Sequence, residues 1–167
     1  MVRSSAAEAL GSIGEMNSDV MDGLLTALKD QREVVRASAA ETLGSLTASP
    51  TTKDGLFVAL NDTHGYVSAT AASVLVNSGM IDANIINTLI TSLISDFPGA
   101  RAIAARTLGR VRLHTGSSNK GELLRQAKDA LYKALNNADN DEMVYVGRYY
   151  WHVYSFIWQA LWDLTTP

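Results

Sequence analysis

Histidines and carboxylates are the side chains of this sequence best suited to bind a transition metal, because the 167 residues include no cysteine. The three histidines, His64, His114 and His152, lie far apart, and none begins an HxxE or HExxH pattern. Zinc sites are built from thiolates and from histidines at such short spacings. Each histidine is therefore interpreted as a loop or surface residue, and we predict no metal site.

Motifs for nucleotide binding and for hydrolysis are also missing from the sequence. It has no GxxxxGK[ST] loop, no GxGxxG turn and no GxSxG elbow. Asp19 and Asp22 resemble a catalytic carboxylate pair. At the first turn of a helix, however, they more simply complement the helix dipole. We therefore predict a protein that is not an enzyme and holds no cofactor.

Charge is distributed unevenly, although the formal net charge is only −3. Residues 63–99 contain no lysine or arginine, whereas residues 100–133 carry eight basic side chains against two acidic ones. Arg106 and Arg110 belong to this basic stretch. It is interpreted either as an ordinary solvated face or as a patch for an acidic partner or a phosphate backbone.

A short apolar pattern occurs four times, and its copies begin at positions 2, 35, 67 and 100. The copies are VRSSAAEALG at 2–11, VRASAAETLG at 35–44, VSATAASVLV at 67–76 and ARAIAARTLG at 100–109. Every copy has paired alanines at positions five and six and a leucine at position nine. So regular an interval indicates a repeat architecture. We name this pattern the ten-residue motif.

A leucine-rich stripe follows each motif, at 24–28, 56–60, 89–93 and 131–135. Its apolar residues at i, i+1 and i+4 lie on one face of a helix. Each unit is thus predicted to be two helices, which must stack on neighbouring units to bury their apolar faces. Gly11, Gly14, Gly44 and Gly109 are expected to form left-handed helix ends. Asp82 is expected to cap a helix.

These motifs resemble the HEAT-repeat superfamily over roughly residues 2–137, and most closely its short-period, phycobilisome-lyase type. The resemblance implies an all-α, right-handed α-solenoid of about four helix pairs. It also implies a ladder between repeats in which Asp30 pairs with Arg36. Two rungs are incomplete, because Asp62 faces Ser68 and Ser95 faces Arg101. The family includes adaptors, lyase subunits and sensor arrays of large ATPases.

The C-terminal stretch 144–167 holds eight of the twelve aromatic side chains. Val144, Trp151, Tyr154, Trp158, Leu161 and Trp162 share one face of a helix. We therefore expect residues 143–167 to form an aromatic helix that caps the solenoid. Tyr149 and Tyr150, together with Trp162, are alternatively expected to bind a partner, since Trp and Tyr are enriched in binding hot spots. Some bacterial NACHT-type ATPases have similarly aromatic ends, and the chain is expected to be such a C-terminal repeat segment.

The predicted organisation is a repeat array over 1–142, with units starting near 2, 35, 67 and 100 and an insertion near 113–121, followed by the capping helix over 143–167. The most apolar stretches are too short and too polar to cross a bilayer, so we expect a soluble protein. The lack of cysteine suits the cytoplasm, which is the expected location.

The predicted function is a non-catalytic scaffold that binds another protein through the concave ridge of its second helices. The alternatives are binding of a nucleic-acid backbone by the basic fourth unit, and a chromophore-lyase subunit. The ridge residues expected to face a partner are Asp22, Thr26, Asp54, Val58, Asn87, Thr91, Asp129 and Lys133.

Overall fold

The computed structural model describes residues 2–13, 18–46, 50–111, 120–137, 143–146 and 149–165. These residues form nine helices and two strands. In chain order they are α1 (Val2–Ile13), α2 (Ser18–Ala27), α3 (Glu33–Ser45), α4 (Pro50–Ala59), α5 (Gly65–Asn77), α6 (Ala83–Ser92), α7 (Pro98–Arg110), α8 (Lys120–Asn137), β1 (Met143–Val146), β2 (Tyr149–His152) and α9 (Val153–Thr165).

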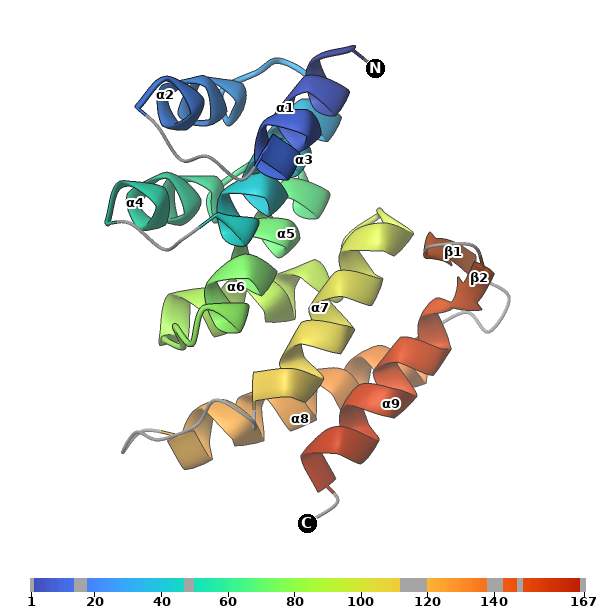
Figure 1. Cartoon of the computed structure of the whole chain (residues 1–167). Helices are drawn as coiled ribbons and strands as arrows, with labels where there is room; N and C mark the ends of the chain where they lie inside the picture. Colours follow the sequence, from blue (N-terminus) through green and yellow to red (C-terminus); the bar gives the residue numbers. More distant parts are fainter. Residues whose placement is uncertain are drawn as a thin grey trace.

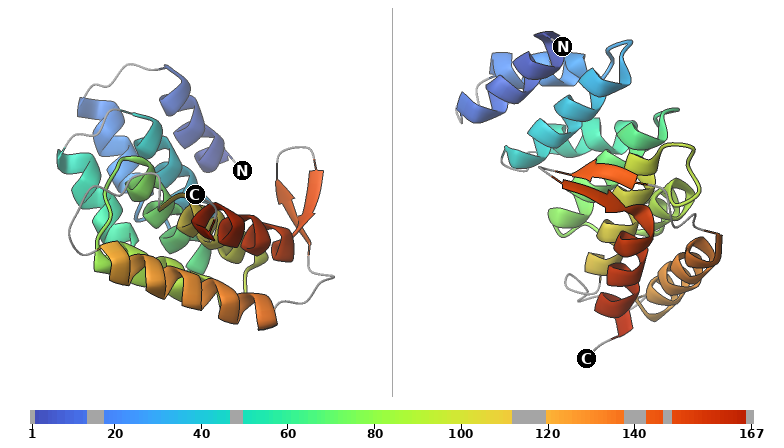
Figure 2. Two further views of the ribbon diagram at one scale, coloured as in Figure 1. Left: turned by 90° about the horizontal axis from the view of Figure 1, so that it is seen from below. Right: turned by 90° about the vertical axis from the view of Figure 1, so that its right-hand side faces the viewer.

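The helices stack in two layers (Figure 1). In the first layer each helix packs on the next, in the order α1, α3, α5, α7 and α9. In the second layer α2 contacts α4, and α6 contacts α8. Figure 2 shows the same succession from two further sides. This helical stack confirms the predicted helical repeat, with each ten-residue motif lying in a first-layer helix.

The core runs along the contact between the two layers. The motif leucines Leu43, Leu75 and Leu108 are fully buried, as are the paired alanines that precede them in α3, α5 and α7. An alanine at these positions lets neighbouring first-layer helices approach closely, and the leucine fills the space that remains. The repeat pattern therefore encodes the stacking itself.

The glycines of the ten-residue motif serve a different purpose from the one expected. Gly11, Gly44 and Gly109 lie inside helices, and Gly79 is the one glycine with a positive φ among the described residues. A Cβ on Gly11 would lie 2.7 Å from Cγ2 of Thr42 in the next first-layer helix, and one on Gly44 would lie 2.4 Å from Cγ1 of Val74. These glycines allow consecutive first-layer helices to pack in close contact, because they have no Cβ. The expectation of left-handed helix ends is wrong for all three, and Gly14 lies outside the described residues.

The turn between α5 and α6 shows where capping does occur. Gly79 adopts φ 80° there, and the Asp82 side chain accepts a 2.8 Å hydrogen bond from the Ile85 amide. This bond satisfies one of the free amides at the start of α6. The predicted Asp82 cap is confirmed.

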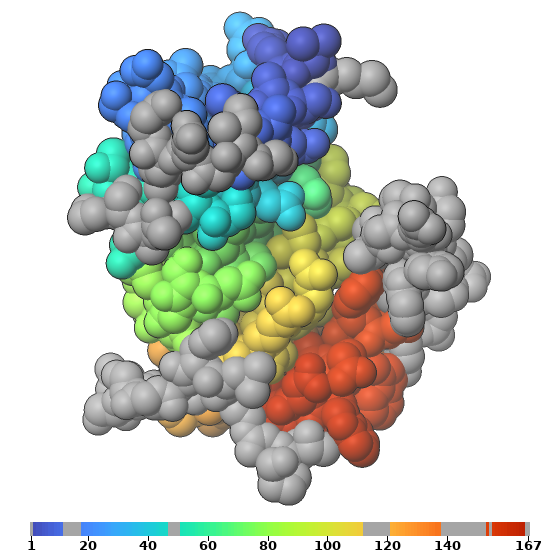
Figure 3. All heavy atoms as spheres, viewed as in Figure 1, coloured from blue at the N-terminus to red at the C-terminus, as the bar shows by residue number. Residues whose placement is uncertain are grey.

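Helix α9 occupies the place of a fifth first-layer helix. A Cβ on Gly109 would lie 2.8 Å from Cα of Ala160 in α9. The contact is equivalent to those of Gly11 and Gly44, each of which meets position eight of the motif in the next first-layer helix. In this register residues 153–162, VYSFIWQALW, share Val at position one and Ala-Leu at positions eight and nine with residues 2–11. Figure 3 shows α9 against α7 on the molecular surface. This fifth copy was not predicted from the sequence, in which Trp158 and Trp162 replace the alanine and the glycine of the motif.

The expected aromatic helix over 143–167 needs correction. Residues 143–146 and 149–152 form an antiparallel hairpin in which Val144 pairs with Trp151, and the helix begins only at Val153. Both strands consist largely of Val, Tyr and Trp, which favour extended structure. Two residues separate them, and the first of these is glycine, a sequence typical of hairpins.

The expected apolar stripe of the C-terminal helix also differs. The buried side of α9 is made by Val153, Ile157, Ala160, Leu161 and Leu164. Trp158 and Trp162 are 50% and 61% exposed. Helical spacing alone did not distinguish these two faces, because both carry apolar residues.

No helix among the described residues is both long enough and apolar enough to cross a membrane.

The close contact at Gly109 provides a test of the stack. We expect Gly109→Ala to destabilise the protein by about 1–3 kcal/mol, because the added methyl group meets the backbone of α9. Gly23→Ala is the matched control. Its Cβ would meet only Cδ1 of Leu10, at 3.9 Å, so it should stabilise the protein by up to about 1 kcal/mol. Urea denaturation measures both changes, and equal effects would contradict the close packing of α7 on α9.

Candidate interaction surface

The second-layer helices present the predicted ridge to solvent. Asp22 and Thr26 lie on α2, Asn87 and Thr91 on α6, and all four are exposed. The remaining ridge residues, on α4 and α8, are exposed as well: Asp54, Val58, Asp129 and Lys133. The structure therefore places all eight side chains where a partner could contact them. Their role in binding stays a prediction.

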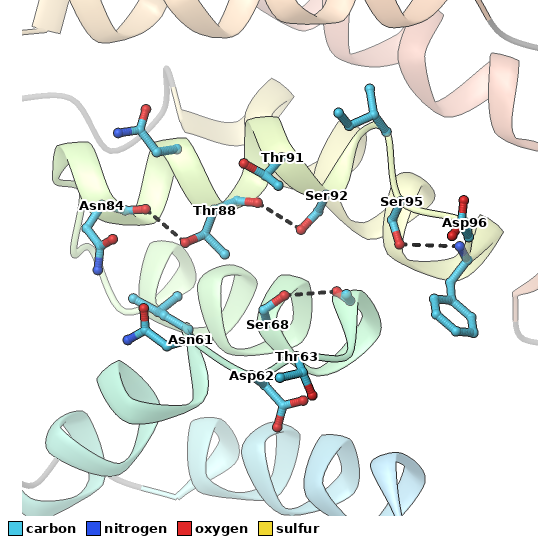
Figure 4. A pocket seen from close by; sticks show the side chains of 15 residues that line it. Asn61, Asp62, Thr63, Ser68, Asn84, Thr88, Thr91, Ser92, Ser95 and Asp96 are labelled. Carbon is cyan, nitrogen blue, oxygen red and sulfur yellow. Dashed lines mark hydrogen bonds between the residues drawn. The ribbon is translucent and has the colours of Figure 1, made fainter.

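A groove of about 650 Å³ opens along the α6 part of this ridge (Figure 4). One wall is α6, which contributes Asn87 and Thr91 of the predicted ridge. The opposite wall is the turn from α4 to α5 and the start of α5, and the α6–α7 turn closes one end. Its side chains are mostly hydroxyls and amides, with exposed Ile94 and Phe97 at the α6–α7 turn.

Three of the serine and threonine hydroxyls in this groove donate their protons to backbone carbonyls. Thr88 donates to the Asn84 carbonyl at 3.0 Å, and Ser92 donates to the Thr88 carbonyl at 2.8 Å. On the facing helix, Ser68 donates to the Gly65 carbonyl at 3.2 Å (Figure 4). Since a hydroxyl has one proton, these oxygens offer the groove only lone pairs. At these three positions the groove therefore accepts hydrogen bonds, whereas the amides of Asn61, Asn84 and Asn87 can also donate them.

An arginine–aspartate ladder connects the repeats next to the groove. The Arg36 Nε atom lies 2.6 Å from Oδ2 of Asp62, and its Nη2 lies 2.9 Å from Oδ1, so the pair is bidentate. Its Nη1 donates to the carbonyls of Asp30 at 2.8 Å and Gln31 at 3.1 Å. One guanidinium thus joins the turn before α3 to the turn before α5.

The predicted partners on this ladder need correction. The Asp30 carboxylate was expected to pair with Arg36, but it pairs with Arg3 at 3.0 Å, and Arg36 bonds the Asp30 carbonyl instead. Arg3 and Arg36 therefore each bind the carboxylate that ends their own helix pair. The carboxylate is held there because its Oδ1 caps the following turn, accepting from the Arg32 amide at 2.9 Å.

The environment of Asp62 sets its protonation. Partial burial raises the pKa of the Asp62 carboxyl, but the hydrogen bonds from the Arg36 side chain and the His64 amide outweigh this effect. The net pKa is below its ordinary value, and the Arg36 pKa is raised by the same bond. Both side chains are largely shielded from solvent, with exposed fractions of 15% and 12%. The rung is therefore ionised at neutral pH.

The third repeat lacks this rung. Ser68 stands where Arg3, Arg36 and Arg101 stand in the other motifs. Ser95 stands where Asp30 and Asp62 stand, and its Oγ accepts from the Phe97 amide at 3.3 Å as those carboxylates accept from Arg32 and His64. Arg101 donates through Nη1 to the Ser95 carbonyl. The two incomplete rungs expected from the sequence, Asp62 with Ser68 and Ser95 with Arg101, need correction: Asp62 pairs with Arg36, and the gap lies between Ser68 and Ser95, which both line the groove.

An aromatic pair borders the groove at the α6–α7 turn. The rings of His64 and Phe97 lie 3.9 Å apart at 38°. His64 Nδ1 is buried without a hydrogen-bond partner among the described residues. Phe97 remains 44% exposed, and Ile94 beside it is 72% exposed. The groove therefore combines a polar interior with an apolar end.

The basic stretch is split by the structure. Arg106 and Arg110 are exposed on α7. On α8, Arg125 is held between Glu122 at 2.7 Å and Asp129 at 3.3 Å, which neutralises that part of the patch. These bonds lower the pKa of Glu122 and raise that of Arg125. Most of the predicted insertion, residues 113–121, lies outside the described residues.

The aromatic candidates do not form one described surface. Trp162 is exposed on α9, whereas Tyr149 and Tyr150 lie in β2, of which the structure describes only the backbone. In the described part of the chain, no three metal-ligating side chains come together. His64 takes part in the ring contact above, and the side chains of His114 and His152 are outside the described residues.

Sequence reasoning missed Ser68, Ser95, Asp96 and Phe97 as groove residues. The break in the arginine pattern at position 68 was visible, but no local pattern connected it with a cavity. Only the packing of α6 against the α4–α5 turn shows that the missing side chain leaves accessible space.

The rung between Arg36 and Asp62 provides a second prediction. We expect Asp62→Asn to destabilise the fold by about 1.5–3 kcal/mol at pH 7, because it weakens two charge-assisted hydrogen bonds. A carboxyl with a lowered pKa contributes fully to the free energy of unfolding above its pKa in the unfolded chain. This contribution is lost as the pH falls through the lower folded-state pKa. The difference in unfolding free energy between wild type and variant, measured by urea denaturation, should therefore decrease toward about pH 3. Asp22→Asn, an exposed control, should change stability little at either pH.

Comparison with known proteins agrees with this geometry for the first part of the chain. Residues 1–75, which include α1 to α4 and most of α5, match the family model for HEAT repeats. No curated protein matches the sequence. The match supports the placement of these helix pairs in the HEAT-repeat superfamily.

Proposed function

We propose that this protein is a non-catalytic scaffold that binds another protein through its second-layer ridge. The observation that carries the proposal is the exposure of all eight ridge side chains, with a groove of about 650 Å³ along α6. HEAT repeats generally serve as protein-interaction scaffolds and are generally non-catalytic. Extended repeat surfaces suit this task, because each unit adds contact area without altering the next.

The proposed architecture is a right-handed solenoid of four HEAT-like pairs, with the ridge on its concave side and α9 as its terminal helix. Trp158 and Trp162 support this role for α9. Trp158 occupies motif position six, where the preceding first-layer helices have alanine. Trp162 occupies position ten, where those helices, except α5, have the glycine that allows close contact with a neighbour. A further helix of the same type would meet two indole rings there. The lyase-like character of the repeats rests on their short period, with starts at positions 2, 35, 67 and 100.

The exposed Trp162 extends the proposed binding surface to the C-terminal end, together with Tyr149 and Tyr150 of the hairpin. A large exposed aromatic side chain is a typical anchor for a partner. The cytoplasmic location and the origin from a larger bacterial NACHT-type ATPase stay predictions, as does the chromophore-lyase alternative.

Binding of a nucleic-acid backbone is the second candidate function. It is favoured by the exposure of Arg106 and Arg110 on α7, a different helix from the one that carries the neutralised Arg125 cluster. The ridge itself argues for a protein partner, because its part on α6 carries no basic side chain.

Site-specific cross-linking tests the scaffold proposal. A photoreactive benzoylphenylalanine at Thr91, on the ridge, should give discrete protein adducts in cells. The same residue at Glu41, which is exposed on the first-layer helix α3, is the control and should give none of them. Adducts of equal pattern at both sites, or none at any of the ridge positions Thr26, Val58 and Thr91, would refute the ridge as the binding surface.

The nucleic-acid alternative predicts a steep salt dependence. Affinity for duplex or single-stranded oligonucleotides should fall with rising salt, and Arg106→Glu with Arg110→Glu should reduce the slope by about two. Fluorescence anisotropy across a salt series from about 50 to about 200 mM measures this change. Absent or salt-insensitive binding excludes this second function.

A further inference from the structure

The groove along α6 lies where the repeat lacks its own arginine. In the second repeat, Arg36 lies between the turn before α3 and the carboxylate of Asp62. One repeat later the equivalent position is Ser68, whose hydroxyl turns back to the Gly65 carbonyl. Ser68 lines the groove. A guanidinium that connects two turns is thus replaced by a short side chain that bonds only the Gly65 carbonyl of its own helix.

The surroundings of this position keep the features that bind an arginine elsewhere. Arg36 bonds the carbonyls of Asp30 and Gln31, and the equivalent residues of the third repeat, Asp62 and Thr63, both line the groove. Ser95 occupies the position of the carboxylate partner, and Asp96 follows it. Both line the same groove, and Asp96 is exposed. A cationic donor group is the ligand that such a set fits.

Hydrogen-bond polarity favours the same ligand. The hydroxyls of Ser68, Thr88 and Ser92 have donated their protons to backbone carbonyls, so their oxygens face a ligand as acceptors. The Asp62 carboxylate is already bound by Arg36, which leaves Asp96 as the carboxylate available to a ligand. Residues 63–99 contain no lysine or arginine, and the described residues that line the groove include no basic one. A phosphate or a carboxylate would meet the Asp96 carboxylate with no cationic lining side chain to balance its charge.

The apolar end of the groove suits the remainder of such a side chain. Phe97 and Ile94 are exposed beside Asp96. An arginine packs its methylene groups on apolar surface and stacks its flat head on aromatic rings. Lysine fits less well, because its compact ammonium group lacks the planar, several-pronged set of N–H donors by which a guanidinium reaches acceptors on two turns at once.

We propose that this groove binds an arginine side chain of the partner protein, which completes the rung missing at Ser68. The inference rests on the proposed scaffold function and names the chemistry of the partner at one point of the ridge. The partner's guanidinium would lie between the Asp62 and Thr63 carbonyls and the Ser95–Asp96 turn, as Arg36 lies one repeat earlier.

Amide NMR spectra of the full chain test the proposal directly. The probe is N-acetyl-arginine N-methylamide, and the matched control is the citrulline analogue, which has the same shape without the charge. The arginine probe should give saturable shifts at the amides of 62–68 and 95–97, and the citrulline probe should bind at least about tenfold more weakly.

Variants of the chain separate this site from general charge effects. Ser68→Arg should restore the rung, raise the melting temperature and abolish probe binding. Asp96→Asn should weaken binding about fivefold. Glu41→Gln, which changes the net charge equally outside the groove, should have no effect. Ser95→Asp, which restores the carboxylate found in the other repeats, should tighten binding about five- to tenfold.

The proposal is overturned by equal binding of arginine and citrulline, by the absence of saturable shifts, or by unchanged binding in both Ser68→Arg and Asp96→Asn. If Ser68→Arg does not fold, the opposite effects expected of Ser95→Asp and Asp96→Asn still decide. Adducts from the Thr91 cross-linker without arginine binding would leave the scaffold function standing and reject only the arginine site.

Discussion

Close contact between first-layer helices is the constraint on which the structure depends. A helix pair of this kind cannot bury both of its apolar faces alone, so it needs a neighbour. The fully buried alanine pairs, from Ala39-Ala40 to Ala104-Ala105, bring consecutive helices near enough for the leucines to fill the interior. Gly44 and Gly109 extend the same close approach to the far end of each helix, where a Cβ would overlap the next one. Small side chains at fixed positions thus determine the spacing of the stack.

Charged side chains add a second connection outside this apolar seam. The Arg36 guanidinium bonds two backbone carbonyls of one turn and the carboxylate of the next, and so fixes the distance between consecutive turns. The same carboxylate caps the turn that leads into α5 through the His64 amide. A serine at position 68 removes one such connection without disturbing the seam, because the apolar contacts of α5 lie on its other positions. A repeat protein can in this way open a local site while it keeps its fold.

The α6 part of the ridge and the exposed face of α7 carry different charges and therefore favour different partners. The α6 part of the ridge is rich in hydrogen-bond acceptors and lacks basic residues, whereas α7 exposes Arg106 and Arg110. On α8 the acidic neighbours of Arg125 neutralise part of the basic stretch. Mixed charges of this kind orient a protein partner and select against wrong ones more than they add affinity. This agrees better with a scaffold than with a uniform nucleic-acid surface.

The sequence by itself determined the helical repeat, its period and the exposure of the ridge, because each of these follows from local spacing that recurs from one unit to the next. It also showed that Ser68 and Ser95 interrupt the ladder, but only the structure showed that the two belong to one rung. The tertiary structure alone decided what the glycines do, which face of α9 is buried, and that residues 153–162 form a fifth first-layer helix. Those outcomes depend on which helices contact one another. In α9, Trp at motif positions six and ten makes the fifth copy unrecognisable by sequence comparison. The groove, too, exists only because α6 and the α4–α5 turn leave unfilled the space that an arginine occupies one repeat earlier.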